Sequence, residues 1–180
     1  MMPPGIDRSQ NPPLFQMGAY RFQRFCRDLY SREEGIATCE VFGINGQAQY
    51  GIDVLAKRSG RYEFEVAQCK CYEDFPASDI AEAGTQFLTY WDGFWSDFGV
   101  KKFVLIVSCD LEERSRQEEI LQQTGIFRER GIDYEVWSIS AILQRLRPFP
   151  ELEDTSISPT NGFPSFATPL TQSTPQMLTR

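Results

Sequence analysis

The chain has no histidine among its 180 residues. Ser-His-Asp triads, Cys-His pairs and nucleases with a histidine base all need an imidazole that takes up a proton near neutral pH. Those classes are excluded for this chain. Any hydrolytic chemistry in it must rest on carboxylates, lysine and a bound metal ion.

Long apolar runs are also missing. No stretch reaches the roughly 18 apolar residues that span a bilayer. Residues 1–13 contain four prolines and lack the basic-then-apolar order of a signal peptide. We therefore expect a cytoplasmic protein with no membrane partner.

Cysteine and positive charge are both limited. The five cysteines are an odd number, which favours reduced and mostly buried thiols. Cys69 and Cys71 lie two positions apart, but no second pair stands at zinc-finger spacing.

The net charge of −7 argues against a protein that coats nucleic acid. DNA binding would need a basic face, an oligomer or another domain.

Composition divides the chain into three parts. Residues 1–13 are expected to be a flexible leader, and 14–148 a folded domain. Residues 149–180 are predicted to be a linker or disordered tail, because Pro, Ser and Thr make up 14 of the 30 residues from Glu151 to Arg180. Such a tail suggests that the domain is one module of a longer protein.

Hydrophobic periodicity predicts an α/β domain. An amphipathic helix is expected over 14–30, followed by three strands with short turns that form an antiparallel meander. A strand buried on both faces is expected at 102–108, and Ser138 is expected to cap the last helix. The predicted strands cover 36–42, 49–57, 61–71, 102–108 and 133–137, and the later helices 76–91, 112–130 and 138–146.

The stretch from Tyr50 to Tyr72 holds the most informative pattern. Alternation in its second strand puts Gln68 and Lys70 on one face with apolar residues, where a lysine needs a partner. Glu65 falls on the opposite face and is expected at the surface. Asp53, on the neighbouring strand, adds a carboxylate. These three groups together suit a divalent cation and an activated water.

This arrangement resembles the PD-(D/E)xK nuclease superfamily, and more narrowly the Mrr-like restriction endonuclease domain. The residues that carry the resemblance are Gly51-Ile52-Asp53 and Gln68-Cys69-Lys70, with Phe22-Gln23 of the first helix in support. The resemblance covers about residues 14–147. It implies a restriction-endonuclease-like αβββαβ core with a mixed central sheet flanked by helices.

The resemblance also implies roles for individual residues. Asp53, Gln68 and the backbone carbonyl of Cys69 would bind Mg²⁺ or Mn²⁺, and Lys70 would act on the attacking water. The sequence departs from the family at Gln23, where many members have a glutamate, and at Gln68, where an acidic residue is common. Glu33, Glu34 or Glu40 could supply a second carboxylate, and Glu40 is the preferred one.

Other polar and aromatic residues have two readings. Arg21, Arg24 and Arg27 in the first helix either form a phosphate-facing stripe or belong to a helix that only packs one side on the core. Gln86 and Tyr90, one helical turn apart, either approach the DNA backbone or have no such role. The aromatic segment 92–99 is either a packed loop or a platform for a base or a partner.

The resulting hypothesis is a metal-dependent endonuclease acting on double-stranded DNA, as the effector module of a prokaryotic anti-phage or restriction system. By the same resemblance we expect a homo-oligomer fused or coupled to a sensor NTPase domain. One alternative is a catalytically inactive nuclease-fold module that binds DNA or protein. Another is a small redox or metal protein that uses Cys69 and Cys71.

Overall fold

The structure, a computed structural model, describes residues 13–43 and 47–152. A first helix is followed by three consecutive strands, and helices and strands then alternate, in the predicted order. They are η1 (Leu14–Met17, a 3-10 helix), α1 (Ala19–Tyr30), β1 (Ile36–Val41), β2 (Val54–Arg58), β3 (Phe64–Lys70), α2 (Ala77–Leu88), η2 (Trp91–Trp95, a π-helical turn), β4 (Val100–Val107), α3 (Arg114–Arg128), β5 (Asp133–Trp137) and α4 (Ile139–Leu146).

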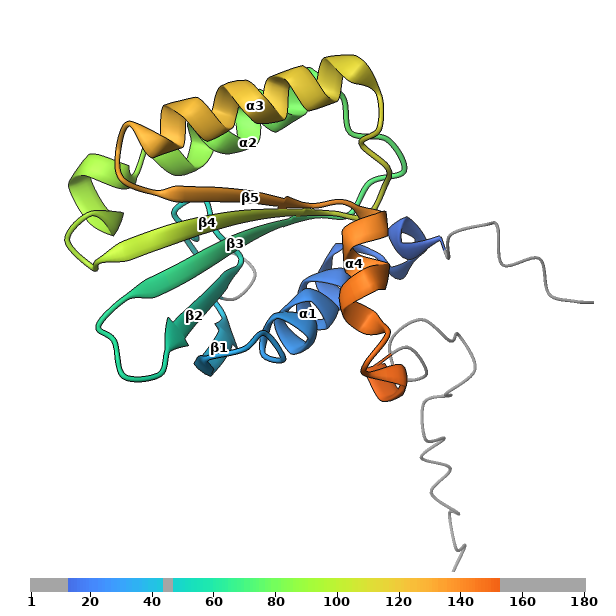
Figure 1. Cartoon of the computed structure of the whole chain (residues 1–180), viewed down its shortest axis with the longest axis horizontal. Coiled ribbons are helices and arrows are strands. Elements are labelled where there is room, and N and C mark those ends of the chain that lie inside the picture. The colour runs from blue at the N-terminus through green and yellow to red at the C-terminus, as the bar shows by residue number, and fades with distance from the viewer. Residues whose placement is uncertain (1–12, 44–46, 153–180) are drawn as a thin grey trace, which may run out of the picture.

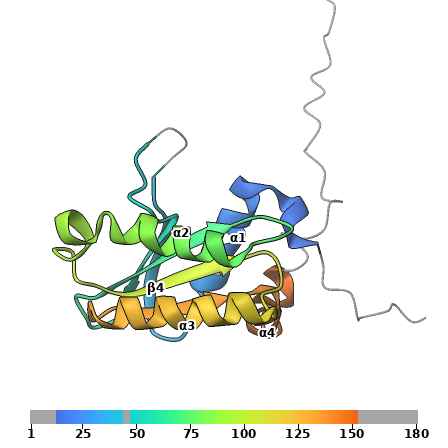
Figure 2. The same cartoon turned by 90° about the horizontal axis from the view of Figure 1, so that it is seen from above.

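The five strands form one mixed sheet in the order β1-β2-β3-β4-β5. β1, β2 and β3 are antiparallel neighbours, which confirms the predicted meander. β4 and β5 continue the sheet in parallel, each reached through a helix. Helices α2 and α3 cover one face and α1 and α4 the other (Figure 1), and α2 and α3 run side by side (Figure 2). The expectation of an α/β fold with a mixed sheet flanked by helices is confirmed.

β4 lies at the centre of both cores. Val104 and Ile106 pack toward α1 and α4, whereas Phe103 and Leu105 pack toward α2 and α3. Residues 103–107 are all buried. The continuous apolar run therefore marks a strand covered on both faces, as predicted.

Several predicted boundaries are wrong. The first helix is interrupted at Gly18, whose positive φ of 78° separates η1 from α1. β2 begins at Val54, so Asp53 precedes the strand instead of lying within it. Ser138 takes the N-cap position of α4, but its side chain makes no capping hydrogen bond with the described residues. Residues 44–46, in the predicted turn between the first two strands, lie outside the described residues.

The expectation that Glu65 lies at the surface is wrong. Its side chain is on the face opposite Lys70, as the alternation requires, but that face is covered by α1. The Tyr30 hydroxyl donates a 2.5 Å hydrogen bond to Glu65, and Arg58 forms an ion pair with it. A buried carboxylate is tolerated when its charge is paired and hydrogen-bonded in this way.

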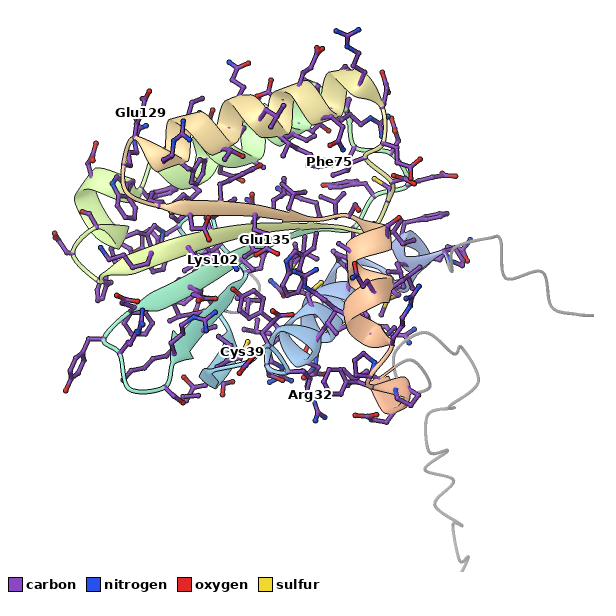
Figure 3. The ribbon with its side chains drawn as sticks, in the orientation of Figure 1. Arg32, Cys39, Phe75, Lys102, Glu129 and Glu135 are labelled. Atoms are coloured by element: carbon purple, nitrogen blue, oxygen red, sulfur yellow. The ribbon has the colours of Figure 1, made fainter. Side chains whose placement is uncertain are left out.

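A second charged group lies on the same face of the sheet. Glu135 pairs with Lys102 and with Arg145 of α4. The guanidinium of Arg145 also lies 4.2 Å from the ring centroid of Trp137. Figure 3 shows Lys102 and Glu135 between the sheet and α1. These pairs join α4 to the sheet.

Packing continues to Leu152, which is buried in the core beside α1 and α4. The folded region thus extends four residues past the predicted boundary at 148. The predicted leader and most of the predicted tail lie outside the described residues. Across 13–43 and 47–152, no helix is long and apolar enough to cross a membrane.

Candidate active site

The site lies where β2 and β3 separate. β2 begins at Val54, which pairs with Ala67 of β3. The last three residues of β3, Gln68–Lys70, run past this point and pair only with β4 on their other side. The edge of β3 that faces away from β4 is therefore open. Asp53 occupies this fork.

Asp53 is held by four hydrogen bonds. Its backbone N–H donates to the carbonyl of Ala67 at 2.8 Å, and its carbonyl accepts from the N–H of Phe42 at 2.8 Å. In the side chain, Oδ2 accepts from the backbone N–H of Cys69 at 2.7 Å, and Oδ1 accepts from Nε2 of Gln23 at 2.8 Å. The carboxylate therefore ties β3 to α1.

Burial raises the pKa of the Asp53 carboxyl above its usual value. The hydrogen bond from Cys69, the charge of Lys70 and the hydrogen bond from Gln23 act in the opposite direction but do not cancel the effect of burial. The ionised form is thus less stable here than in water. A bound cation would favour it.

Gln68 is the most buried polar residue of the site, with 4% of its surface exposed. Its Nε2 donates a 2.6 Å hydrogen bond to Oε1 of Gln86 on α2. Its own Oε1 is buried and has no partner among the described residues. Leaving a buried oxygen unpaired costs about 1–3 kcal/mol. Such an atom inside a functional pocket is consistent with a ligand or ordered water at that place.

Lys70 lies two residues beyond Gln68 on the same face. Its ammonium forms no hydrogen bond or salt bridge with the residues that the structure describes, yet its charge lowers the pKa of Asp53. It is half-buried and lines the same pocket. Lys70 is therefore positioned to meet a ligand rather than a protein carboxylate.

Gly51 explains how the chain reaches the fork. Its φ is +79°, and a Cβ placed on it would lie 2.9 Å from Cα of Phe87 in α2. Tyr50 before it also has a positive φ, 49°, which is uncommon for a residue with a side chain. The left-handed backbone conformation of Tyr50 and Gly51 lets the chain turn close to α2, immediately before Asp53.

These elements enclose a pocket of about 400 Å³. It brings together most of the residues that the sequence singled out, from three different parts of the chain. Its lining includes Asp53, Gln68, Cys69, Lys70, Gln86 and Tyr90. Gln23 is connected to the pocket through its hydrogen bond with Asp53.

Several predicted residues are not brought to this pocket. Glu40, the preferred second carboxylate, is exposed on β1, lies 3.8 Å from Arg27 and is not among the residues that line the pocket. Arg21 and Arg24 are exposed on α1 and are not part of the pocket lining. Nη1 of Arg24 donates a hydrogen bond to the hydroxyl of Tyr20 at 2.9 Å.

The donor atoms suit a hard divalent cation. Asp53 offers carboxylate oxygens that accept more than one hydrogen bond or ligand each, and Gln68 offers an unpartnered amide oxygen. The Cys69 N–H points to Asp53, and the carbonyl of a strand residue points to the same side as its N–H. Magnesium prefers such oxygens and keeps several waters. The residues therefore fit the metal, although residues 13–43 and 47–152 hold no group of three acidic or cysteine side chains at metal-binding distance.

The cysteines next to the site are protected. A hydrogen bond with Cys26, together with burial, raises the pKa of the Cys69 thiol. Burial likewise raises the pKa of Cys71, whose Sγ lies 3.4 Å from the carbonyl of Phe15. High pKa values disfavour the thiolate that redox chemistry and zinc binding require. These thiols are better explained as packing groups.

Two tyrosines of the pocket were not predicted from the sequence. Tyr50 and Tyr72 both line it, and they mark the two ends of the stretch that carries the metal-binding pattern. Tyrosine in a turn gives no distinctive signal. The chain shows no match to known family models, to curated proteins or to solved structures. Inferences about function therefore rest on the site itself.

Proposed function

We propose that this chain is a metal-dependent DNA endonuclease with a restriction-endonuclease-like core of the Mrr type. The observation that carries the proposal is the meeting of three groups in one pocket. They are the carboxylate of Asp53, the buried oxygen of Gln68 and the ammonium of Lys70, the last two without a partner in residues 13–43 and 47–152. Few structural roles require all three together.

The fold supports the same proposal. The resemblance implies an aspartate at a fork between the second and third strands, next to a strand that ends in the metal-binding and lysine positions. Asp53 precedes β2, and Gln68 and Lys70 end β3. The first helix contributes Gln23 to the aspartate, at the place where related domains use a glutamate.

In this proposal Asp53, Gln68 and the Cys69 carbonyl hold Mg²⁺ or Mn²⁺. The bound metal would neutralise charge that develops on the phosphate and lower the pKa of a water ligand. Lys70 orients the attacking water and stabilises the negative charge of the transition state. Gln23 and the Cys69 N–H fix the Asp53 carboxylate, so that little reorganisation is needed during the reaction.

The negative net charge of the chain is the reason to expect a homo-oligomer. Among the described residues that line the pocket, Lys70 is the only cation, and the whole chain carries a net charge of −7. A monomer would therefore bind DNA weakly, because phosphate contacts supply most non-specific affinity. Oligomerisation multiplies weak contacts. We propose that a sensor NTPase domain drives it in a prokaryotic anti-phage or restriction system.

Nicking of supercoiled plasmid tests this function. The full chain is assayed with Mg²⁺, with Mn²⁺ and with EDTA, both as purified and fused to a dimerising segment. We expect metal-dependent nicking by the wild type, reduced at least about 100-fold in Asp53→Asn. Asp92→Asn changes an exposed aspartate in η2 and serves as the control. Nicking that survives EDTA, or that Asp53→Asn leaves unchanged, would overturn the assignment.

A binding module is the second proposal, and one observation favours it. Asp53 is the only carboxylate among the described residues of the pocket lining, because Gln68 and Gln23 stand where related nucleases have acidic groups. Fewer carboxylates mean weaker metal binding. This alternative predicts DNA or protein binding with no turnover in any oligomeric state.

A further inference from the structure

The pocket that holds Asp53 and Lys70 is rich in tyrosine rings and glutamine amides. Within the described part of the lining these two are the only charged side chains. The other large side chains are tyrosines and glutamines, namely Tyr50, Tyr72, Tyr90, Gln49, Gln68 and Gln86. This composition differs from that of a surface that follows the phosphates of a duplex.

Duplex binding depends on cations that replace the counterions of the phosphates. Arg21 and Arg24 are outside the lining, and Arg24 is engaged with Tyr20 by a hydrogen bond and by a contact of 5.6 Å to the ring centroid. Base stacking on aromatic rings provides affinity without many cations, but only for bases that are not paired inside a duplex. The lining therefore favours unpaired DNA.

Tyr50 forms a rigid wall of the pocket. Its ring stacks on Phe94 with centroids 4.3 Å apart and planes 18° apart. Its carbonyl accepts a 2.8 Å hydrogen bond from Nε1 of Trp95. The rings of Tyr90 and Tyr50 are edge to face, with centroids 5.4 Å apart and planes 83° apart. The aromatic segment after α2 thus holds Tyr50, and Tyr50 in turn packs against Tyr90.

Tyr72 and Tyr90 line the pocket and are also open to solvent. Tyr72 is 56% exposed and Tyr90 is 40% exposed. Exposed aromatic rings that border a pocket with convergent polar groups are typical of ligand-binding sites. Both rings therefore offer surface on which a base can stack.

Gln86 completes a base-binding arrangement. Its Oε1 accepts from Gln68, so its Nε2 is left to donate to an acceptor on a base edge. The volume of about 400 Å³ falls in the range of small-ligand pockets, which fits a single nucleotide. Stacking surface, hydrogen-bond donor and hydrolytic groups then belong to one cavity.

We propose that the pocket takes one unpaired nucleotide of DNA, with its base against Tyr72 and Tyr90 and its phosphate toward Lys70. The inference rests on the proposed function, and it changes the expected substrate. Cleavage is directed to gaps, flaps and melted positions instead of intact double-stranded DNA.

Binding is measured by fluorescence anisotropy in EDTA, which prevents metal-dependent hydrolysis. The probes are fluorescein-labelled DNAs of one sequence: an intact duplex, a duplex with a central gap, and a single strand. We expect the gapped and single-stranded probes to bind at least about tenfold more tightly than the duplex. Equal affinities, or no binding of the gapped probe, would overturn the proposal.

Substitutions of Tyr72 and Tyr90 test whether their rings stack on the bound base. Tyr72→Leu and Tyr90→Leu should each weaken binding of the gapped probe by at least about fivefold, the lower end expected for loss of one stacked base. Tyr72→Phe and Tyr90→Phe keep the ring and should bind as the wild type. Tyr62→Leu, at a tyrosine that is 94% exposed and outside the pocket, is the control for a lost surface ring. Leucine variants that bind as tightly as the wild type contradict the proposal, and the same melting temperature in all variants shows that each one folds.

The two proposals fail in different ways. Ring-dependent binding of unpaired DNA without metal-dependent cleavage supports the pocket's ligand and overturns the nuclease. Metal-dependent cleavage of intact duplex at the rate of gapped DNA supports the nuclease and overturns the preference for an unpaired nucleotide.

Discussion

The backbone N–H of Cys69 donates a 2.7 Å hydrogen bond to Oδ2 of Asp53. If β2 and β3 were paired along their whole length, this N–H would donate to a backbone carbonyl of β2. The pairing of β2 with β3 does not extend to Cys69, because β2 begins at Val54 opposite Ala67. The side chain of Asp53 takes the place of that strand residue. The bond satisfies an otherwise open edge of β3, and it fixes the carboxylate between Gln68 and Lys70, the neighbours of Cys69.

Burying the ionised carboxylate of Asp53 lowers the free energy of unfolding, and Asp53→Asn removes this effect. Because burial raises the pKa of Asp53, the ionised side chain destabilises the folded state above that pKa. The cost is absent at low pH, where the group is protonated, and develops as the pH rises through the raised pKa. We expect Asp53→Asn to have an equal or higher free energy of unfolding at pH 7, and the difference from wild type to shrink as the pH falls.

Urea unfolding at several pH values measures this difference. The asparagine oxygen still accepts from Cys69, and the Gln23 amide can rotate to accept from the new amide, so no hydrogen bond is lost. Asp53→Asn that is clearly less stable than the wild type at pH 7 would show that the ionised carboxylate stabilises the fold.

Gly51 should be intolerant of a side chain. Gly51→Ala combines a strained positive φ with a contact of 2.9 Å to Cα of Phe87, so we expect a loss of about 2–4 kcal/mol of stability. Gly60→Ala has the same kind of φ, +71°, with no described atom within 4 Å of its Cβ, and should cost only about 1–2 kcal/mol. Chemical denaturation of both variants gives the comparison. Equal losses would mean that the close approach to α2 adds nothing.

Two buried tyrosines, one with and one without a hydrogen-bond partner for its hydroxyl, test how much the hydrogen bond to the buried Glu65 stabilises the fold. The Tyr30 hydroxyl donates to Glu65, so Tyr30→Phe should cost about 1.5–3 kcal/mol, the range for a hydrogen bond to a charged group. The Tyr134 hydroxyl is buried without a partner in the described structure, so Tyr134→Phe should be neutral or stabilising. Thermal and urea unfolding measure both. A larger loss for Tyr134→Phe would contradict the assigned hydrogen bonds.

Gln23 controls how many carboxylates face the pocket. Gln23→Glu would place a second carboxylate within hydrogen-bond distance of Asp53, and we expect it to tighten Mn²⁺ binding about five- to tenfold. Isothermal titration calorimetry measures the affinity directly. Gln144→Glu adds the same charge at an exposed position on α4 and controls for a change in net charge. An identical affinity in Gln23→Glu and wild type would argue that no metal binds beside Asp53.

Local patterns predicted much of this protein. Alternation in β3 correctly put Gln68 and Lys70 on one face, and the apolar run at 102–108 correctly indicated a strand buried on both sides. Both signals come from neighbouring residues, which is why the sequence alone reveals them. The strand order of the meander followed from short turns for the same reason.

What the sequence could not predict depends on residues that meet only in the folded chain. Glu65 is buried because Tyr30, 35 positions earlier, and Arg58 pair with it. The orientation of Gln23 toward Asp53 joins residues 30 positions apart. Glu40 lies on β1, where its distance from the fork depends on the bounds of β2.

The nicking rate of supercoiled plasmid by Lys70→Ala in Mg²⁺ or Mn²⁺ tests the proposed hydrolytic site most directly. Lys101→Ala is the matched control, because it removes an exposed lysine from β4 outside the pocket. We expect Lys70→Ala to lose at least about 100-fold in rate with an unchanged melting temperature, while Lys101→Ala nicks as the wild type. Equal rates for Lys70→Ala and the wild type would contradict the claim that Asp53, Gln68 and Lys70 form one hydrolytic site.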